Sequence, residues 1–161
     1  MNLIDVKSPA DLKGLSISEL TDLTAQARQA LMTKVSEHGG HFGPPMGAAE
    51  IIMALHYVFN SPVDKIVYDV SHQSYVHKMV TGRALAFLDH DHYDDVTGYT
   101  DPTESEHDFF NIGHTSTSIS LASGLATARN LKGTLKILSL LSVMVLYLVG
   151  KPLKVSIMQQ H

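Results

Sequence analysis

The chain contains no cysteine, no sustained run of lysine or arginine, and no basic segment followed by an apolar one at its amino terminus. The absence of cysteine excludes a disulfide scaffold and a thiolate metal site. A formal net charge of -4 without a basic cluster offers no electrostatic footprint for nucleic acid or an anionic membrane. We therefore expect no nucleic-acid or membrane partner. Because the segment Met1-Asn-Leu-Ile-Asp-Val-Lys7 lacks a leader pattern, we also expect a cytoplasmic protein.

A length of 161 residues favours one domain, and ten histidines make metal binding a question to weigh. His90 and His92 lie in a segment rich in aspartate, residues 89–95, which has enough side-chain ligands for a divalent ion. No helical or strand spacing directs those side chains to one point. We therefore interpret the segment as a solvated surface loop and assign no metal ligands.

Two helices are predicted in the first third of the chain. Ser16-Ile-Ser-Glu19 matches a capping box, in which the Ser16 hydroxyl accepts from the third helical amide and Glu19 reaches back to the cap. Apolar residues then recur at helical spacing until Gly39-Gly40, which permits a stop. A turn over residues 39–47 contains His41, and a second apolar helix is predicted over residues 48–59.

A short buried strand is predicted at residues 66–70, where β-branched residues form an apolar run. Ser71 and His72 would lie at its carboxyl end. Ligands bind at that edge of open parallel sheets, so His72 is a candidate functional residue. A histidine that only caps the strand is the alternative.

The remaining segments divide into a polar excursion and a helix. Residues 84–108 are rich in Asp and His and are expected to form a long loop rather than a core element. Residues 113–130 are expected to form a helix, whose first turn offers the amides and hydroxyls of residues 115–118. Such a helix terminus favours binding of a phosphate, although an ordinary Ser/Thr helix cap would show the same residue pattern.

Several motifs, in order along residues 3–133, together resemble the 1-deoxy-D-xylulose-5-phosphate synthase family. The quoted segments are Gly40-His-Phe-Gly43, Leu55-His-Tyr-Val-Phe59, Asp69-Val-Ser-His-Gln-Ser-Tyr75 with His77-Lys78, Thr81-Gly-Arg83, Glu104-Ser-Glu106 and Gly113-His-Thr-Ser-Thr-Ser-Ile-Ser120. The resemblance covers only the amino-terminal part of that enzyme. It implies an α/β fold of transketolase type, in which a parallel sheet flanked by helices forms an incomplete thiamine-diphosphate-binding domain.

The resemblance also implies roles for individual residues. His41 would handle protons at the reacting centre, His72 would contact the cofactor, and Gly113, His114 and Thr115 would form a further cofactor contact. The implied cofactors are thiamine diphosphate and Mg²⁺, and the intact family works as a homodimer. The implied reaction condenses pyruvate with glyceraldehyde 3-phosphate, with loss of CO₂, for isoprenoid and thiamine biosynthesis. Histidine suits the proton steps because its unperturbed pKa is about 6.5.

Some positions depart from the family pattern. Ser71 stands where the family usually has Gly, and Tyr68 stands near its usual Trp. The cofactor class is unaffected by these changes. A transketolase-like two-carbon transferase of other specificity stays open, as does an inactive fragment that binds a partner chain.

Residues 134–161 form a separate apolar tail that lacks the Gly-Asp-Gly-Ser metal motif expected of the family and contains no Asp or Glu. A DNA sequence can be written that encodes the expected Gly-Asp-Gly-Ser-Leu-Ser-Gly-Gly-Glu-Ala. When its translation starts one base later, the product is identical to residues 143–152 of this chain. We therefore expect a frameshift near Thr134, with a premature stop after His161. A membrane anchor is the alternative, but the apolar run over residues 137–150 is shorter than the ~20 residues that a spanning helix needs.

Overall fold

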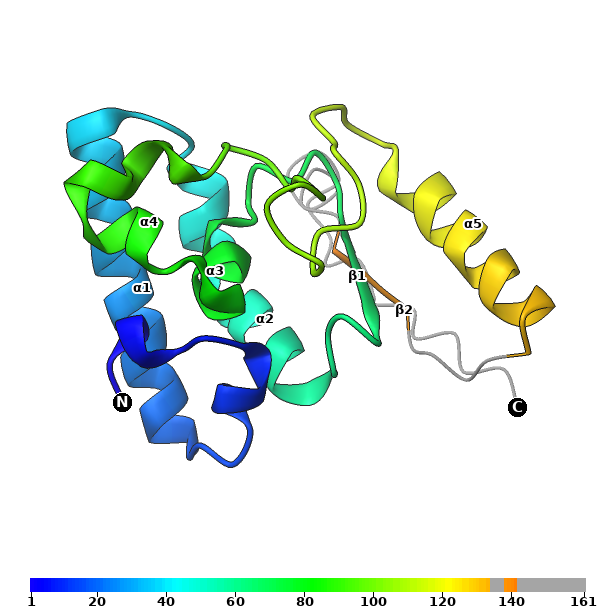
Figure 1. The fold of residues 1–161 in the computed structure, drawn as a ribbon, viewed down its shortest axis with the longest axis horizontal. Helices are drawn as coiled ribbons and strands as arrows, with labels where there is room; N and C mark the ends of the chain where they lie inside the picture. Colours follow the sequence, from blue (N-terminus) through cyan, green and yellow to red (C-terminus); the bar gives the residue numbers. More distant parts are fainter. Residues whose placement is uncertain (134–137, 142–161) are drawn as a thin grey trace.

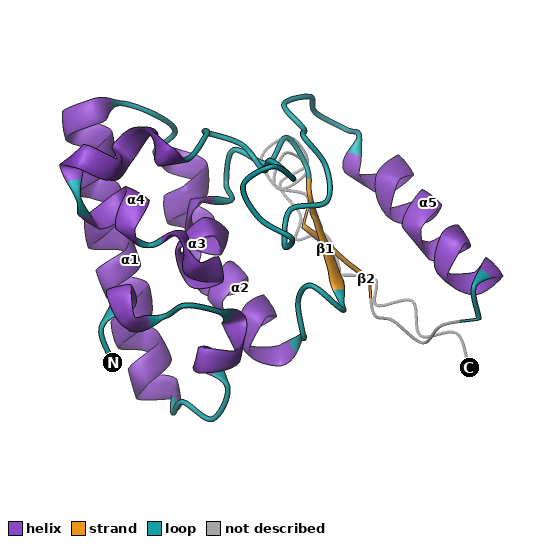
Figure 2. Cartoon of the chain, viewed as in Figure 1, coloured by secondary structure: helices purple, strands orange, loops and turns teal. Residues whose placement is uncertain are grey.

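A computed structural model describes residues 1–133 and 138–141 of the chain. These residues are mostly helical (Figure 2). The α-helices are α1 (Ile17–His38), α2 (Gly43–Val58), α3 (Tyr75–Lys78), α4 (Leu85–Leu88) and α5 (Ser118–Leu131). The strands are β1 (Lys65–Tyr68) and β2 (Leu138–Leu141), and the shorter helical turns are η1 (Leu3–Asp5), η2 (Pro9–Leu12), η3 (Met79–Arg83) and η4 (His90–Asp95).

Helix α1 starts where the capping box predicts. The Ser16 hydroxyl accepts from the Glu19 amide at 3.3 Å, and the Glu19 carboxylate accepts from the Ser16 amide at 2.7 Å. The helix ends at Gly39, whose φ of 90° is a conformation that glycine adopts readily. Leu23, Ala27 and Leu31 from its apolar face are buried in the core. The predicted first helix is therefore confirmed.

Helix α2 begins five residues earlier than its predicted start at residue 48. Gly43 is the first helical residue, and Pro44 and Pro45 lie in the first turn. Proline is tolerated there because the first amides of a helix have no intrahelical partner and its fixed φ suits the helix. The expected turn over residues 39–47 is thus too long, and only residues 39–42 separate α1 from α2.

The two strands form one parallel pair, in which Lys65 lies opposite Leu138 and Tyr68 lies opposite Leu141. Figure 1 shows this pair between the group of helices α1 to α4 and the separate helix α5. β1 ends at Tyr68, two residues before the predicted end of the strand, because Val70 and Ser71 turn with positive φ. The described residues thus contain helices and a two-stranded parallel pair, and the larger flanked sheet stays a prediction.

Residues 84–108 are not the solvated excursion that their composition indicates. They contain α4 and η4, and Phe87, Tyr93 and Asp108 are buried. The buried ammonium of Lys34 in α1 donates to the carbonyl oxygens of Ala86 at 2.8 Å and Tyr93 at 2.7 Å. It also lies 4.4 Å from the centre of the Phe87 ring, a cation–π distance. These contacts hold α4 and η4 against α1.

The predicted tail lies outside the described residues except for β2. None of the helices in the described ranges 1–133 and 138–141 is both long enough and apolar enough to span a bilayer.

The capping box of α1 gives a stability prediction. Replacing Ser16 by Ala removes the side-chain acceptor of the Glu19 amide, so we expect the free energy of unfolding to fall by about 1 kcal/mol. Urea unfolding monitored by circular dichroism measures this change. Ser18→Ala, in the same exposed turn, is the matched control and should stay within a few tenths of a kcal/mol of the parent. Equal values for the two variants would rule out the cap as a source of stability.

Candidate functional site

The structure brings together two of the histidines that the sequence singles out. His41 lies between α1 and α2, and His72 lies in the turn that follows β1. Their ring centroids are 5.2 Å apart in an edge-on arrangement. Burial lowers the pKa of His72, His41 lowers it further, and Asp69 opposes the change. The Nδ1 atom of His72 is buried and has no hydrogen-bond partner among the described residues.

Two tyrosines orient His41. The Tyr75 hydroxyl accepts from the His41 amide at 3.2 Å and lies 3.3 Å from its Nδ1 atom. When the hydroxyl donates a hydrogen bond to Nδ1, the tautomer of His41 has its proton on Nε2, which leaves an N–H donor on the far side of the ring. The Tyr99 ring meets His41 edge-on at 5.2 Å. The side chain is thus held by α3 on one side and by the loop after η4 on the other.

A cavity of about 280 Å³ adjoins His41. Its lining combines residues at the end of α1 with Tyr75, Tyr93 and the loop after η4. The Lys34 ammonium lines this cavity, and burial is the main cause that lowers its pKa to about 8. Gly98 also lines it, and a Cβ atom added there would lie 3.4 Å from both the His41 ring and the Tyr75 hydroxyl. A side chain at position 98 would therefore crowd His41.

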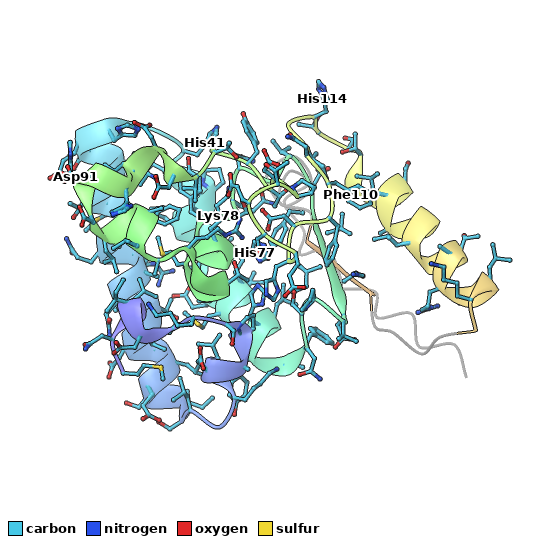
Figure 3. All side chains as sticks on the ribbon, in the orientation of Figure 1. His41, His77, Lys78, Asp91, Phe110 and His114 are labelled. Atoms are coloured by element: carbon cyan, nitrogen blue, oxygen red, sulfur yellow. The ribbon has the colours of Figure 1, made fainter. Side chains whose placement is uncertain are left out.

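The loop before α5 is the third predicted part of the site. Gly113, His114 and Thr115 are exposed, and Figure 3 shows His114 pointing outward from the tip of that loop. Gly113 lies close to Tyr99, because a Cβ added to it would be 3.8 Å from that ring. The structure therefore links Gly113 to His41 through Tyr99, while His114 points away from the histidine pair.

The amino terminus of α5 already holds an anion from the chain itself. The Asp69 carboxylate accepts from the amides of Ser116, Thr117 and Ser118 at 3.2–3.3 Å. Positive partial charge and free N–H groups make a helix start a natural place for a negative group. The helix begins at Ser118, five residues after the predicted start at 113. The amides expected for a phosphate thus include three that donate to Asp69.

A buried network of charges supports the wall of the site. The Arg83 guanidinium donates to both oxygens of the Asp108 carboxylate at 2.8 and 3.0 Å, and to Glu104 at 2.9 Å. Glu104 also accepts from the fully buried Lys78 ammonium and from the Thr97 amide. The Asp108 carboxylate accepts further from the Asp101 amide. Two carboxylates and two cations thus balance in the interior and fix the loop after η4 against α3 and η3.

The Asp108 carboxylate also accepts the end of a hydrogen-bonded chain that contains two buried histidines. His77 Nε2 lies 2.6 Å from an Asp108 oxygen, and His77 Nδ1 lies 2.8 Å from His56 Nε2. Burial lowers the pKa of His77 and of His56, so both rings are assigned as neutral. His77 then donates from Nε2 to the carboxylate, and His56 donates from Nε2 to His77. One chain of hydrogen bonds therefore runs from α2 through α3 to the loop.

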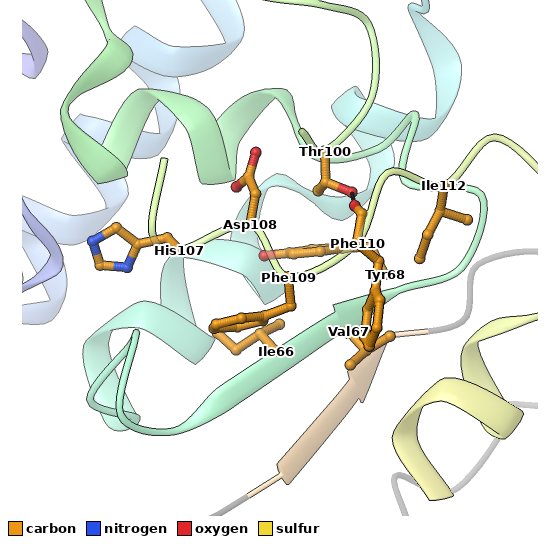
Figure 4. Close-up of a pocket in the computed structure, with 9 residues that line it drawn as sticks. All are labelled: Ile66, Val67, Tyr68, Thr100, His107, Asp108, Phe109, Phe110 and Ile112. Atoms are coloured by element: carbon orange, nitrogen blue, oxygen red, sulfur yellow. Dashed lines mark hydrogen bonds between the residues drawn. The ribbon is translucent and has the colours of Figure 1, made fainter. Parts of the chain in front are cut away.

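The pKa of Asp108 reflects this environment. Burial raises it, but the hydrogen bonds from His77 and Arg83 and the charge of Arg83 outweigh burial and bring the pKa well below its usual range. A cavity of about 10 Å³ lies between Asp108, Tyr68 and Phe110 (Figure 4), which is about the size of one water molecule. This seam between β1 and the loop is therefore closely packed and too small for a substrate.

Sequence reasoning missed Tyr75, Tyr99, Asp69 and Asp108 as contributors to the site. A carboxylate directly after a predicted strand, near a predicted helix start, is a signal that could have identified Asp69. Asp108 lies at the end of a segment interpreted as a surface loop, so its burial had no local signal. In the described parts of the chain, His, Asp and Glu side chains form no group of three or more able to hold a metal ion.

Comparison with known proteins gives a family match over most of the chain. Residues 3–143 match the family model described as 1-deoxy-D-xylulose-5-phosphate synthase. The chain is similar to the 1-deoxy-D-xylulose-5-phosphate synthases of Caldanaerobacter subterraneus subsp. tengcongensis, with 53% identity over 81% of the chain, and of Symbiobacterium thermophilum, with 50% identity over 83%. These matches cover 21% and 20% of the two relatives, so the chain spans about a fifth of their length.

The charge network gives a pH-dependence prediction. The pKa of Asp108 is lower in the folded than in the unfolded chain, so its stabilisation is present above about pH 4 and is lost as the pH falls towards the folded value. We expect Asp108→Asn to unfold about 3–5 kcal/mol more easily at pH 7, because a buried cation loses its partner. Between about pH 5 and pH 2, its stability should change less with pH than that of the parent.

Urea unfolding at a series of pH values measures both effects. Asp22→Asn, which alters an exposed carboxylate of α1, is the matched control and should keep the parental pH profile. Profiles of Asp108→Asn and the parent that run parallel through the acid range would contradict the role assigned to Asp108.

Proposed function

The chain belongs to the 1-deoxy-D-xylulose-5-phosphate synthase family, and we propose that it represents the amino-terminal part of such a synthase. In this proposal the complete enzyme is a thiamine-diphosphate-dependent transferase. It condenses pyruvate with glyceraldehyde 3-phosphate, with loss of CO₂, to give 1-deoxy-D-xylulose 5-phosphate for isoprenoid and thiamine biosynthesis. The observation that carries the proposal is the family match over residues 3–143, within which His41 and His72 lie with their rings 5.2 Å apart.

The proposal includes the larger fold. We propose that the β1–β2 pair is part of a parallel sheet of transketolase type that is flanked by helices. The parallel register of the pair and its place between α5 and the other helices support this view (Figure 1). A homodimeric assembly and a cytoplasmic location belong to the same proposal.

Within the site, His41 is the residue proposed to move protons. The Tyr75 hydroxyl beside Nδ1 favours the His41 tautomer with the proton on Nε2. In that tautomer Nε2 can donate its proton to a reacting group and can then act as a base. His72 is proposed to contact the cofactor through ring atoms that include the unpartnered Nδ1. The lowered pKa of His72 keeps that ring neutral near pH 7, so it recognises by hydrogen bonding rather than by charge.

The residues present fit the organic cofactor better than its metal. When bound, thiamine diphosphate supplies an electron sink for a carbanion. His72, Gly113, His114 and Thr115 are the residues that would hold it. Mg²⁺ requires oxygen ligands, usually carboxylates, and the carboxylate directly after β1, Asp69, accepts hydrogen bonds from the three amides that lead into α5. We therefore derive no step through the metal.

We propose further that residues 134–161 derive from a shifted reading frame that begins near Thr134. The frame-shifted motif begins at residue 143, and residues 134–161 contain no Asp or Glu. The tail would then lack the carboxylate that binds the metal in the family.

The proposed cofactor site can be tested by NMR on the 161-residue chain. We expect thiamine diphosphate at millimolar concentration to shift the signals of His41, His72 and Gly113, while the exposed His90 signal stays unchanged. His72→Ala should reduce these shifts, whereas the control His90→Ala should not. Shifts confined to other regions, or no shifts at all, would overturn the site assignment.

Calorimetry tests the part of the proposal that concerns the metal. With MgCl₂ present we expect binding weaker than about 1 mM, equivalent to about -4 kcal/mol, and no turnover of pyruvate with glyceraldehyde 3-phosphate. Tight binding that depends on Mg²⁺ would show that the chain holds a metal site after all.

Resequencing the coding DNA from codon 125 to a few hundred bases past codon 161 tests the origin of the tail. We expect codons that start one base before those of residues 143–146 to read Gly-Asp-Gly-Ser, and that frame to continue through further domains. If no frame contains this motif, the tail is native and the frameshift proposal fails.

A further inference from the structure

The backbone directly after β1 adopts an unfavourable conformation at two successive residues. Val70 has a φ of 60° and Ser71 has a φ of 71°. Positive φ is uncommon for residues other than glycine and is especially unfavourable for β-branched Val. Backbone hydrogen bonds support the turn, with the Ser71 amide donating to the Asp69 carbonyl at 2.6 Å and the Ser74 amide donating to the Ser71 carbonyl at 3.0 Å.

The Ser71 side chain makes two further hydrogen bonds, both to backbone groups outside the turn. Its hydroxyl donates to the Ile112 carbonyl at 2.7 Å and accepts from the Thr100 amide at 3.0 Å. Ser71 is fully buried, and Thr100 and Ile112 are also buried. Both backbone groups would therefore lose a partner in a dry environment if the hydroxyl were absent.

The two segments that the hydroxyl joins are the ones that surround the histidine pair. Thr100 follows Tyr99, whose ring packs edge-on against His41. Ile112 precedes Gly113, which also lies against Tyr99. Ser71 itself precedes His72. One hydroxyl therefore connects the turn that carries His72 with the loop that packs on His41 and with the loop that leads to α5.

We propose that Ser71 is a positioning residue, whose hydroxyl sets the arrangement of His72 relative to His41 by tying three backbone segments together. The importance of that arrangement rests on the proposed function, whereas the tie itself is a property of the folded chain. Glycine at position 71 would relieve the unfavourable φ but would leave Thr100 and Ile112 without their side-chain partner. Ser71 thus keeps an unfavourable backbone conformation, while its hydroxyl joins three segments of the site.

Three variants of the 161-residue chain separate positioning from ordinary stability. Ser71→Gly removes both the hydroxyl and the unfavourable φ at position 71, and Ser71→Ala removes the hydroxyl alone. Ser74→Ala is the matched control, because Ser74 belongs to the same turn, is fully buried and has a hydroxyl without a hydrogen-bond partner in the described part of the chain.

The first measurement is amide hydrogen exchange. We expect exchange at the Thr100 amide to become at least about tenfold faster in both Ser71 variants, while Leu23 in the core of α1 keeps its protection. Ser74→Ala should leave both amides unchanged. Equal acceleration at Thr100 and Leu23 in Ser71→Gly would indicate a global loss of stability and would overturn the proposal.

The second measurement is the NMR titration of the His72 ring, which a purely structural residue would not alter. The groups that act on its pKa are His41, Asp69 and the burial of the ring. When the turn is released and the ring gains solvent, the His72 pKa should rise towards its ordinary value in Ser71→Gly and not in Ser74→Ala. An unchanged His72 titration in both Ser71 variants would contradict the proposal. Neither measurement requires cofactor, so failure of cofactor binding would not affect the result.

Discussion

The ionised Asp108 carboxylate in the interior is the constraint on which the rest of the site depends. Burying a charge is costly unless it is paired and hydrogen-bonded, and Asp108 meets this condition through Arg83, His77 and the Asp101 amide. These partners come from separate segments, so the carboxylate is satisfied only when the loop after η4 lies against α3 and η3. The same loop supplies Tyr99 and Gly98 to the surroundings of His41. Charge balance in the core thus determines where the loop after η4 lies beside His41.

Local patterns predicted the elements whose causes are local. The Ser16 and Glu19 cap and the apolar spacing that follows it account for α1, and both act within a few residues of each other. The apolar pattern predicts the start of α2 too late, because its two prolines are also typical of a turn, although they fit the first turn of a helix. The polar composition of residues 84–108 predicts a long loop rather than a core element. Their burial depends on Lys34, Lys78 and Arg83, which lie elsewhere in the sequence and which no local pattern connects to them.

The candidate site shows the same division. The position of His72 after a strand was predictable from topology, and the fold brings its ring to within 5.2 Å of the His41 ring. The roles of Tyr75 and Tyr99 were not predictable, since both act by contacts across the fold. Position 71 is a further case, because the Ser71 hydroxyl bonds to Thr100 and Ile112, which lie far from it in the sequence.

Asp69 at the start of α5 has a consequence for how this part of the molecule would receive a negatively charged ligand. Because the carboxylate neutralises the positive end of the helix, the amides at the start of α5 already have an acceptor without a ligand. The same carboxylate screens the attraction that a bare helix end would exert on a free phosphate. Recognition of an anion here would thus favour shape over charge, through a preformed loop at Gly113 to Thr115.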